Sequence, residues 1–423
     1  MPTSSRDPAL PNAIADTVAD AMTMGATAPF ASEKKSEILK RATIIALIAF
    51  LTLIDLFGSQ ALLPTLVEAY GVTPAEMGFA VNASTIGMAV AGVVVALLAR
   101  RIDRKRWIWL SLALLSIPTF LIGLTDDLTV FTLLRVAQGI FMSAAFTLTL
   151  TYLSEECSVT AAAGAMAAYI TGNVASNLFG RLMAAGIADN FGLSESFFAF
   201  SALNLVGAAI AFFHIGASSG APKATGDDGS ILAAWADHFR NARLRAAFGI
   251  GFIILFAFVG TFTYVNFVLA MAPFSLPQAS IGLVYFVFLP AILTTPVAGG
   301  AVKRFGNRPV FWASMGATLF GLGLIATPSL PAVLAGLAAI GAGLFFAQAA
   351  ATSYVGRVTT HDHAAANGIY LTSYYLGGLA GALVLGQVFA GFGWIFTVGV
   401  VAAFVLLACV LARGMGDGEQ PSN

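Results

Sequence analysis

Twelve long apolar runs constrain this chain more than any other feature of its sequence. A helix needs about 20 apolar residues to cross a bilayer. Runs of about that length lie at 42–66, 78–99, 107–124, 129–152, 162–187, 196–216, 246–271, 281–301, 309–327, 332–355, 367–389 and 394–412. Only 10% of the 423 residues are charged, whereas soluble proteins carry about 25%. The pattern predicts an all-α polytopic membrane protein with twelve transmembrane helices.

The basic residues predict how these spans are oriented. Of the 21 Lys and Arg residues, 19 lie in the tails or in alternate connections, and the other two, Arg135 and Arg181, lie within spans. The remaining connections hold acidic residues and no Lys or Arg. Since Lys and Arg accumulate in cytoplasmic loops, both termini are expected in the cytoplasm. The formal net charge is zero, which gives no indication of a nucleic-acid partner.

The two halves of the chain are similar to each other. The stretch YITGNVASNLFG at 169–180 matches YLTSYYLGGLAG at 370–381. Six helices followed by six similar helices in the same orientation is the parallel repeat of transporters, whose substrate site lies between the halves. We therefore expect two six-helix bundles, at 42–216 and 246–413. A cytoplasmic tail at 1–41, a central cytoplasmic linker with an amphipathic segment at 217–245 and a second tail at 414–423 complete the chain.

Several short motifs resemble a known family. Span four contains R-x-x-Q-G at Arg135, Gln138 and Gly139, and span one places Pro64 nine residues after Asp55. With the basic loops ARRIDRKR and GGAVKRFGNR, these motifs resemble the major facilitator superfamily over roughly 42–412. TYLSEE, YITGN and GRL are similar to its twelve-helix drug/sugar–proton antiporters, the arabinose-efflux-type permeases of the bacterial inner membrane. Span five lacks the Gly-Pro pair of drug exporters, which leaves the direction of transport open.

Asp55 is the only acidic residue in a predicted span. It lies about 16 Å from the outer end of span one, near the middle of a hydrocarbon core about 30 Å thick. A charge there costs about 3 kcal/mol on insertion scales and marks function. Burial favours the neutral carboxyl and a nearby arginine favours the charged form, so Asp55 is expected to carry the coupling proton. The resemblance implies that Arg135 modulates it. Alternatively, Asp55 is held by hydroxyls or Gln60 for packing, and Arg135 snorkels outward.

Other polar residues inside apolar spans are candidates for binding a substrate. They are Gln138, Arg181, Tyr264, Asn266, Gln348 and Tyr374. The resulting prediction is a secondary transporter that exports a small amphipathic, drug-like compound or a sugar with proton coupling, by alternating access. Two intramembrane arginines leave an alternative, proton-coupled import of an organic anion bound by Arg135 and Arg181. A non-transporting scaffold or sensor is a further alternative.

The cytoplasmic ends of spans two and eight carry a candidate gate. Its residues are Asp103, Arg104, Lys303 and Arg304, although the positive-inside rule alone also accounts for the cations. His361 and His363 are more typical of a solvated loop than of a metal site. The chain has no phosphate-binding P-loop motif and no nucleophile–base pattern, so we expect no enzyme and no cofactor. The expected partners are a small molecule, protons and the bilayer, and the chain is expected to act as a monomer.

Overall fold

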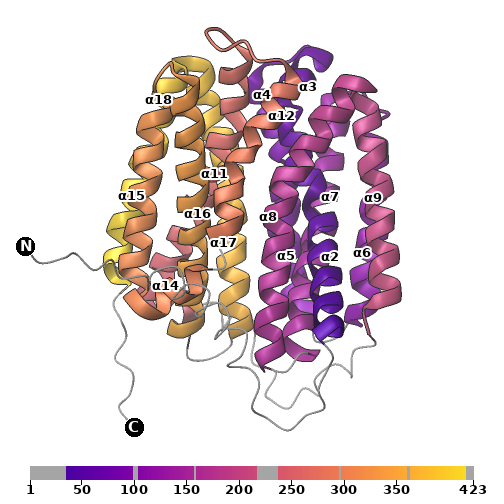
Figure 1. Ribbon diagram of the computed structural model, residues 1–423, viewed down its shortest axis with the longest axis vertical. Coiled ribbons are helices and arrows are strands. Elements are labelled where there is room, and N and C mark those ends of the chain that lie inside the picture. Colours follow the sequence, from indigo (N-terminus) through magenta and orange to yellow (C-terminus); the bar gives the residue numbers. More distant parts are fainter. Residues whose placement is uncertain are drawn as a thin grey trace, which may run out of the picture.

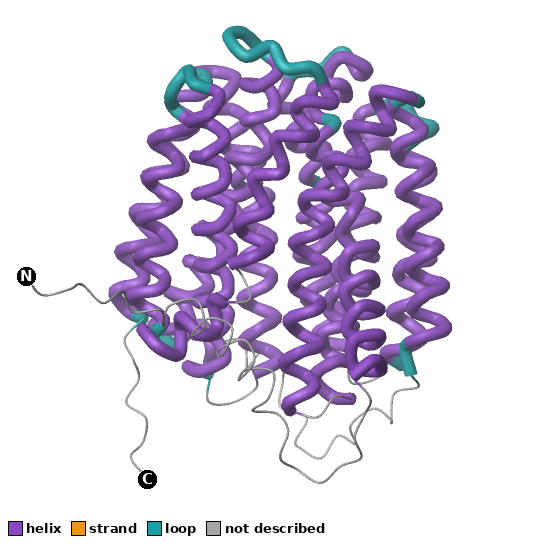
Figure 2. The backbone as a smooth tube through the Cα atoms, viewed as in Figure 1, coloured by secondary structure: helices purple, strands orange, loops and turns teal. Residues whose placement is uncertain are grey.

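The computed structural model describes residues 35–98, 103–156, 159–216, 237–294, 297–359 and 363–415. Over these ranges the regular secondary structure is entirely helical, as predicted (Figure 2). The first half contains α2 (Lys35–Ala61), α3 (Leu63–Tyr70), α4 (Pro74–Asn82), α5 (Ser84–Leu98), α6 (Arg104–Ile122), α7 (Leu128–Glu156), α8 (Val159–Asn190) and α9 (Leu193–His214).

The second half repeats this plan with more interruptions. It contains α11 (Ala242–Ala270), α12 (Gln278–Val284), the 3₁₀ helix η1 (Tyr285–Phe288), α13 (Leu289–Thr294), α14 (Ala298–Phe305), α15 (Asn307–Ile325), α16 (Leu330–Val358), α17 (His363–Phe392), α18 (Trp394–Leu411) and the 3₁₀ helix η3 (Ala412–Gly414). The helices of each half stand together, and the two halves lie side by side (Figure 1). We call the end that carries α3, α4 and α12 the predicted outer end, and the opposite end, which carries α14, the predicted cytoplasmic end (Figure 1).

Helix length and composition agree with a membrane protein. Within the described residues, nine helices are long and apolar enough to cross a membrane. The other three expected spans correspond to α8, to the segment from α12 to α14, and to α15. Each of the twelve apolar runs therefore has a helical counterpart.

The run at 281–301 departs from the single helix that its hydropathy predicts. It is divided into α12, η1, α13 and α14. Pro290 explains the 3₁₀ turn, because a proline has no N–H to donate to the carbonyl four residues earlier and its ring crowds that carbonyl. The turn places Tyr285 at the contact between the two halves, as described below.

The internal repeat has a physical counterpart in how the helices pack. A Cβ atom on Gly180 of α8 would lie 3.0 Å from the Ile54 carbonyl oxygen of α2. A Cβ atom on Gly381 of α17 would lie 2.6 Å from the Phe256 carbonyl oxygen of α11. The two glycines occupy matching places in the repeated sequence, and in each half they let two backbones approach closely.

Candidate functional site

Asp55 lies in a polar cluster inside the first half. α2 places its carboxyl group between α6, α7 and α9, where its exposed fraction is 1%. Its Oδ2 accepts hydrogen bonds from Asn204 Nδ2 (2.7 Å), Thr119 Oγ1 (2.8 Å) and Gln138 Nε2 (3.4 Å). Its Oδ1 has no hydrogen-bond partner among the described residues. Three helices thus present donors to one oxygen and leave the other oxygen available for a proton.

Arg135 belongs to the same cluster but contacts the backbone of Asp55 rather than its carboxyl group. Its Nη1 donates to Gln138 Oε1 (2.6 Å) and to the Asp55 carbonyl oxygen (3.4 Å). Its Nε donates to the Val81 carbonyl oxygen (2.8 Å), and its Nη2 donates to Ser84 Oγ (3.2 Å). All three guanidinium nitrogens are therefore used. Gln138, a predicted substrate ligand, connects the guanidinium to the carboxyl group in this conformation.

The Asp55 carboxyl group is therefore both buried and hydrogen-bonded. Three side-chain donors meet at its Oδ2, and Gln138 joins it to the guanidinium of Arg135. The cluster thus holds one carboxyl group and one guanidinium group inside the first half.

A separate cavity lies between the two halves. It holds about 780 Å³ of empty space, including its opening to solvent. The first half lines it with Leu53, Leu56, Phe57, Gln60, Thr85, Met88, Phe146, Asn173 and Asn177. The second half contributes Ile254, Leu255, Phe258, Val259, Leu344, Phe345, Gln348, Leu371, Tyr374 and Tyr375. Among the described residues, this lining contains no charged side chain and does not include Asp55.

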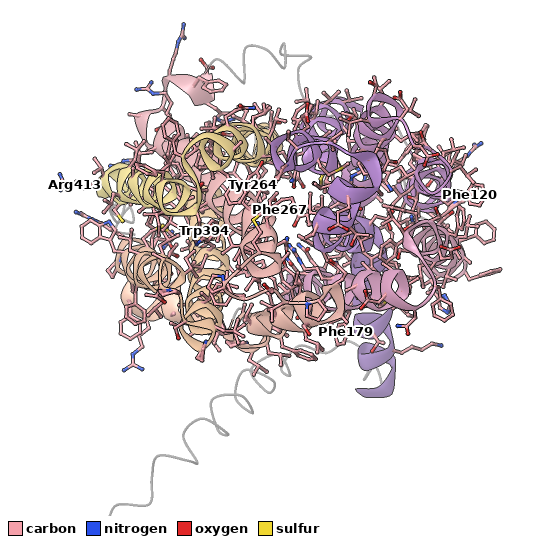
Figure 3. All side chains as sticks on the ribbon, turned by 90° about the horizontal axis from the view of Figure 1, so that it is seen from above. Phe120, Phe179, Tyr264, Phe267, Trp394 and Arg413 are labelled. Atoms are coloured by element: carbon pink, nitrogen blue, oxygen red, sulfur yellow. The ribbon has the colours of Figure 1, made fainter. Side chains whose placement is uncertain are left out.

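Of the predicted substrate ligands, Gln348 and Tyr374 line this cavity. Tyr264 does not. Its hydroxyl donates to the Ala382 carbonyl oxygen (2.6 Å), and its ring stacks on Phe389 with centroids 5.4 Å apart. Seen from above, Tyr264 and Phe267 lie towards the middle of the molecule, whereas Phe120 lies at its edge (Figure 3). In this conformation Tyr264 therefore packs helices together.

Arg181 and Asn266 lie in a polar layer that joins the two halves. Arg181 Nη2 donates to Gln60 Oε1 (2.5 Å), and its Cζ lies 4.0 Å from the centre of the Tyr285 ring. Asn266 Nδ2 donates to the Gln60 carbonyl oxygen (3.0 Å), and Tyr285 donates to Asn266 Oδ1 (2.5 Å). Asn82 accepts from Gln60 Nε2 (2.8 Å). We call these five residues, together with Thr263, the polar seam.

The polar seam lies on the predicted outer side of the cavity. On α8, Arg181 is nearer the outer end than the cavity residues Asn173 and Asn177. On α11, Asn266 is likewise nearer that end than Phe258. Further out, Gln278 Nε2 donates to the Ala61 carbonyl oxygen (2.5 Å). The halves are therefore closed together above the cavity.

The candidate gate residues are only partly described. Asp103 caps α6, because its Oδ1 accepts the backbone N–H of Arg106 at 3.2 Å. Arg104 is buried, and Arg304 is exposed beside the Phe305 ring at 5.2 Å. The side chain of Lys303, like residues 361 and 362, lies outside the described part of the chain. A capping role for Asp103 was not part of the sequence prediction.

Sequence reasoning missed several members of these clusters. Thr119 and Asn204 contact Asp55, and Asn82, Asn177 and Tyr285 belong to or adjoin the seam. Each is a polar residue within an apolar run, which is the signal that could have identified it. Short polar side chains also satisfy their own helix backbone, so that signal does not separate the two roles.

Apolar helices long enough to cross a membrane, a buried ionisable cluster and a cavity between two halves are the features of a polytopic membrane protein with a binding site. The model of the Major Facilitator Superfamily matches residues 45–286 and 262–421. The chain belongs to this superfamily and is a secondary transporter rather than an enzyme. The more specific likeness to arabinose-efflux-type permeases stays a prediction.

Named relatives and solved structures agree with this assignment. The inner membrane transport protein YnfM of Escherichia coli (strain K12) is 29% identical over 368 residues, covering 85% of this chain and 86% of that protein. The uncharacterized MFS-type transporter YybF of Bacillus subtilis (strain 168) is 25% identical over 363 residues, covering 86% and 90%. A mutant of the nucleoside transporter NupG has a TM-score of 0.71 at 15% identity, covering 89% and 99%.

A second solved structure shares the same fold. It is a bacterial homolog of the human lysosomal transporter Spinster, described as inward-facing and unoccupied. Its TM-score is 0.71 at 14% identity, and the match covers 92% of this chain and 100% of that one. These likenesses confirm the predicted fold of twelve helices in two bundles.

Proposed function

We propose that this transporter exports a small amphipathic compound in exchange for protons, and that Asp55 carries the proton. One observation carries the proposal: Asp55 is buried, hydrogen-bonded by three helices and separate from the cavity. Arg135 lies in the same cluster and is joined to this carboxyl group through Gln138. Such intramembrane acids mark proton pathways in transporters.

The orientation predicted from the basic residues assigns a conformational state. With both termini in the cytoplasm, the polar seam closes the periplasmic side and the cavity lies on the cytoplasmic side. A substrate would then enter from the cytoplasm. The alternate state would break the seam and open the other side, as alternating access requires.

The composition of the cavity favours a weakly polar substrate. The first half presents the amides of Asn173 and Asn177, and the second half presents the rings of Phe258 and Phe345. Amide groups hydrogen-bond hydroxyl and carbonyl groups, and the aromatic rings take an apolar body. A molecule with one polar edge and one apolar face fits both walls.

The test compares wild type with Asp55→Asn in cells that lack their own export pumps, at equal membrane levels. Accumulation of dyes, antibiotics, pentoses and aromatic acids is measured with and without a protonophore. Glu68→Gln is the matched control, because Glu68 is an exposed acid near the end of α3. We expect wild type and Glu68→Gln to lower the accumulation of at least one compound. Uphill export by Asp55→Asn at the wild-type rate would contradict the proposal.

A second function has one observation in its favour. Arg181 Nη1 and Asn177 Nδ2 have no acceptor among the described residues, and Arg181 Nε donates to Asn177 Oδ1 (3.2 Å). Two unpaired donors beside the cavity would suit an organic anion taken up with a proton. The same panel separates the two functions, because an importer raises the accumulation of an acid and Arg181→Gln abolishes that rise.

A further inference from the structure

The second transmembrane span is interrupted where the two polar clusters meet. α4 ends at Asn82 and α5 begins at Ser84. At this interruption Arg135 donates to the Val81 carbonyl oxygen on one side and to Ser84 Oγ on the other. Arg135, whose guanidinium belongs to the Asp55 cluster, therefore hydrogen-bonds residues on both sides of the break.

Asn82 extends from this break to the opposite half. Its Nδ2 donates to Thr263 Oγ1 on α11 (3.1 Å) and to the Gly78 carbonyl oxygen (2.8 Å). Its Oδ1 accepts from Gln60, which also binds Arg181. Asn82 is fully buried, so none of these partners is replaced by bulk water. One amide thus connects the break to the whole polar seam.

The break is also in close backbone contact with α7, the helix that carries Arg135. A Cβ atom on Gly139 would lie 1.8 Å from the Ser84 carbonyl oxygen, and one on Gly87 would lie 2.0 Å from the Val136 carbonyl oxygen. With no side chain between the two backbones, a shift of α7 moves the break as well. Coupling between sites requires a physical element of this kind, which both sites bias.

We propose that Asn82 is the positioning residue through which the protonation of Asp55 controls closure of the predicted outer end. This inference rests on the proposed function of Asp55. In the closed state donors from α6, α7 and α9 bind the Asp55 carboxyl group, and protonation changes these hydrogen bonds. By linkage, a state with different bonds to Asp55 has a different proton affinity, so protonation shifts the balance between the closed seam and the broken seam. Asn82 transmits the change because Arg135 hydrogen-bonds Val81 and Ser84, which lie on either side of Asn82 and set its position.

The experiment measures distances between two spin labels at the predicted outer end by double electron–electron resonance spectroscopy. Labels replace Phe191 on the first half and Met271 on the second, which are both exposed, in a background without Cys157 and Cys409. Wild type, Asp55→Asn, Asn82→Ala and Thr263→Val are compared at acidic and alkaline pH. Asn190→Ala is the matched control, since its amide bonds a carbonyl of its own helix at the same end.

Wild type is expected to populate the longer outer distance to different extents at acidic and at alkaline pH, and Asp55→Asn should lose this response. Asn82→Ala and Thr263→Val should raise the open population, by about tenfold at the pH where wild type is closed, because each removes a buried bond between the halves. Both variants should also lose the difference between the two pH values. Asn190→Ala should behave as wild type. If Asn82→Ala and Thr263→Val both respond to pH as wild type does, the inference about Asn82 is wrong and the proposed proton coupling is unaffected. A wild type that does not respond to pH overturns the proposed proton coupling as well.

Discussion

The glycine of the R-x-x-Q-G motif determines how closely α7 can approach the break between α4 and α5. A Cβ atom on Gly139 would lie 1.8 Å from the Ser84 carbonyl oxygen and 2.7 Å from its carbonyl carbon. Real Cβ atoms essentially never come within 3.0 Å of a non-bonded heavy atom. Gly139→Ala therefore forces the two helices apart by more than about 1 Å. Overpacking of this kind costs about 1–3 kcal/mol.

Thermal unfolding of purified protein in one detergent measures this cost. A loss of about 1–3 kcal/mol corresponds to a fall in Tm of about 1–3 °C for a chain of this size. Gly316→Ala is the matched control, because nothing lies within 4 Å of a Cβ atom at Gly316. There alanine is expected to be neutral or to stabilise α15 by up to about 1 kcal/mol.

Equal Tm values for Gly139→Ala and wild type would refute the close approach of α7 to the break. A second readout separates packing from function. Gly139 lies one turn from Arg135, which braces the same break. Gly139→Ala is therefore expected to export more slowly than wild type at equal membrane levels, whereas Gly316→Ala should export normally.

Two further predictions test the cavity and the predicted outer end. Gln348→Ala should raise the KM of export about fivefold, since one hydrogen bond contributes about 1 kcal/mol, and initial rates over a range of substrate concentrations measure this. Burial, and then Asp126 and Asp127, raise the pKa of Tyr70 to about 12, and its hydroxyl donates to the Thr125 carbonyl oxygen (2.5 Å). The stability that this raised pKa contributes is complete below about pH 10 and is lost as pH rises towards 12. Thermal unfolding should therefore show a smaller fall in Tm over this pH range for Tyr70→Phe than for wild type.

The sequence predicted the helices well because the membrane leaves few choices. A backbone in hydrocarbon must satisfy its own hydrogen bonds, so long apolar runs become helices. The 281–301 segment was the most divided run, and Pro290 was the available signal. The runs at 42–66 and 78–99 are each divided once, between α2 and α3 and between α4 and α5. The charges were equally informative, because Asp55 and Arg135 could not lie in hydrocarbon without partners. Their placement in one cluster agrees with the family resemblance.

Which face of each helix lines the cavity could not be predicted in the same way. Whether a side chain enters the cavity depends on the rotation of its helix, which advances about 100° per residue. Leu56 lines the cavity while Asp55, its neighbour, faces away from it. For the same reason Gln138 and Gln348, both glutamines within apolar runs, have different partners. The rotation is set by packing between helices, which a single sequence does not display.

The geometry of α2 indicates how substrate and proton can influence each other without touching. Leu53, Leu56 and Gln60 line the cavity, and at 100° per residue they lie on the side of α2 away from Asp55. Under the proposed function, a substrate in the cavity would contact one face of α2 while Asp55 carried the proton on the other face. Gly180 lets α8 approach the backbone of α2 closely, so a displacement of α2 would also move its neighbour. Because such a contact would be indirect, the cavity could accept molecules of varied chemistry while the proton site stayed unchanged.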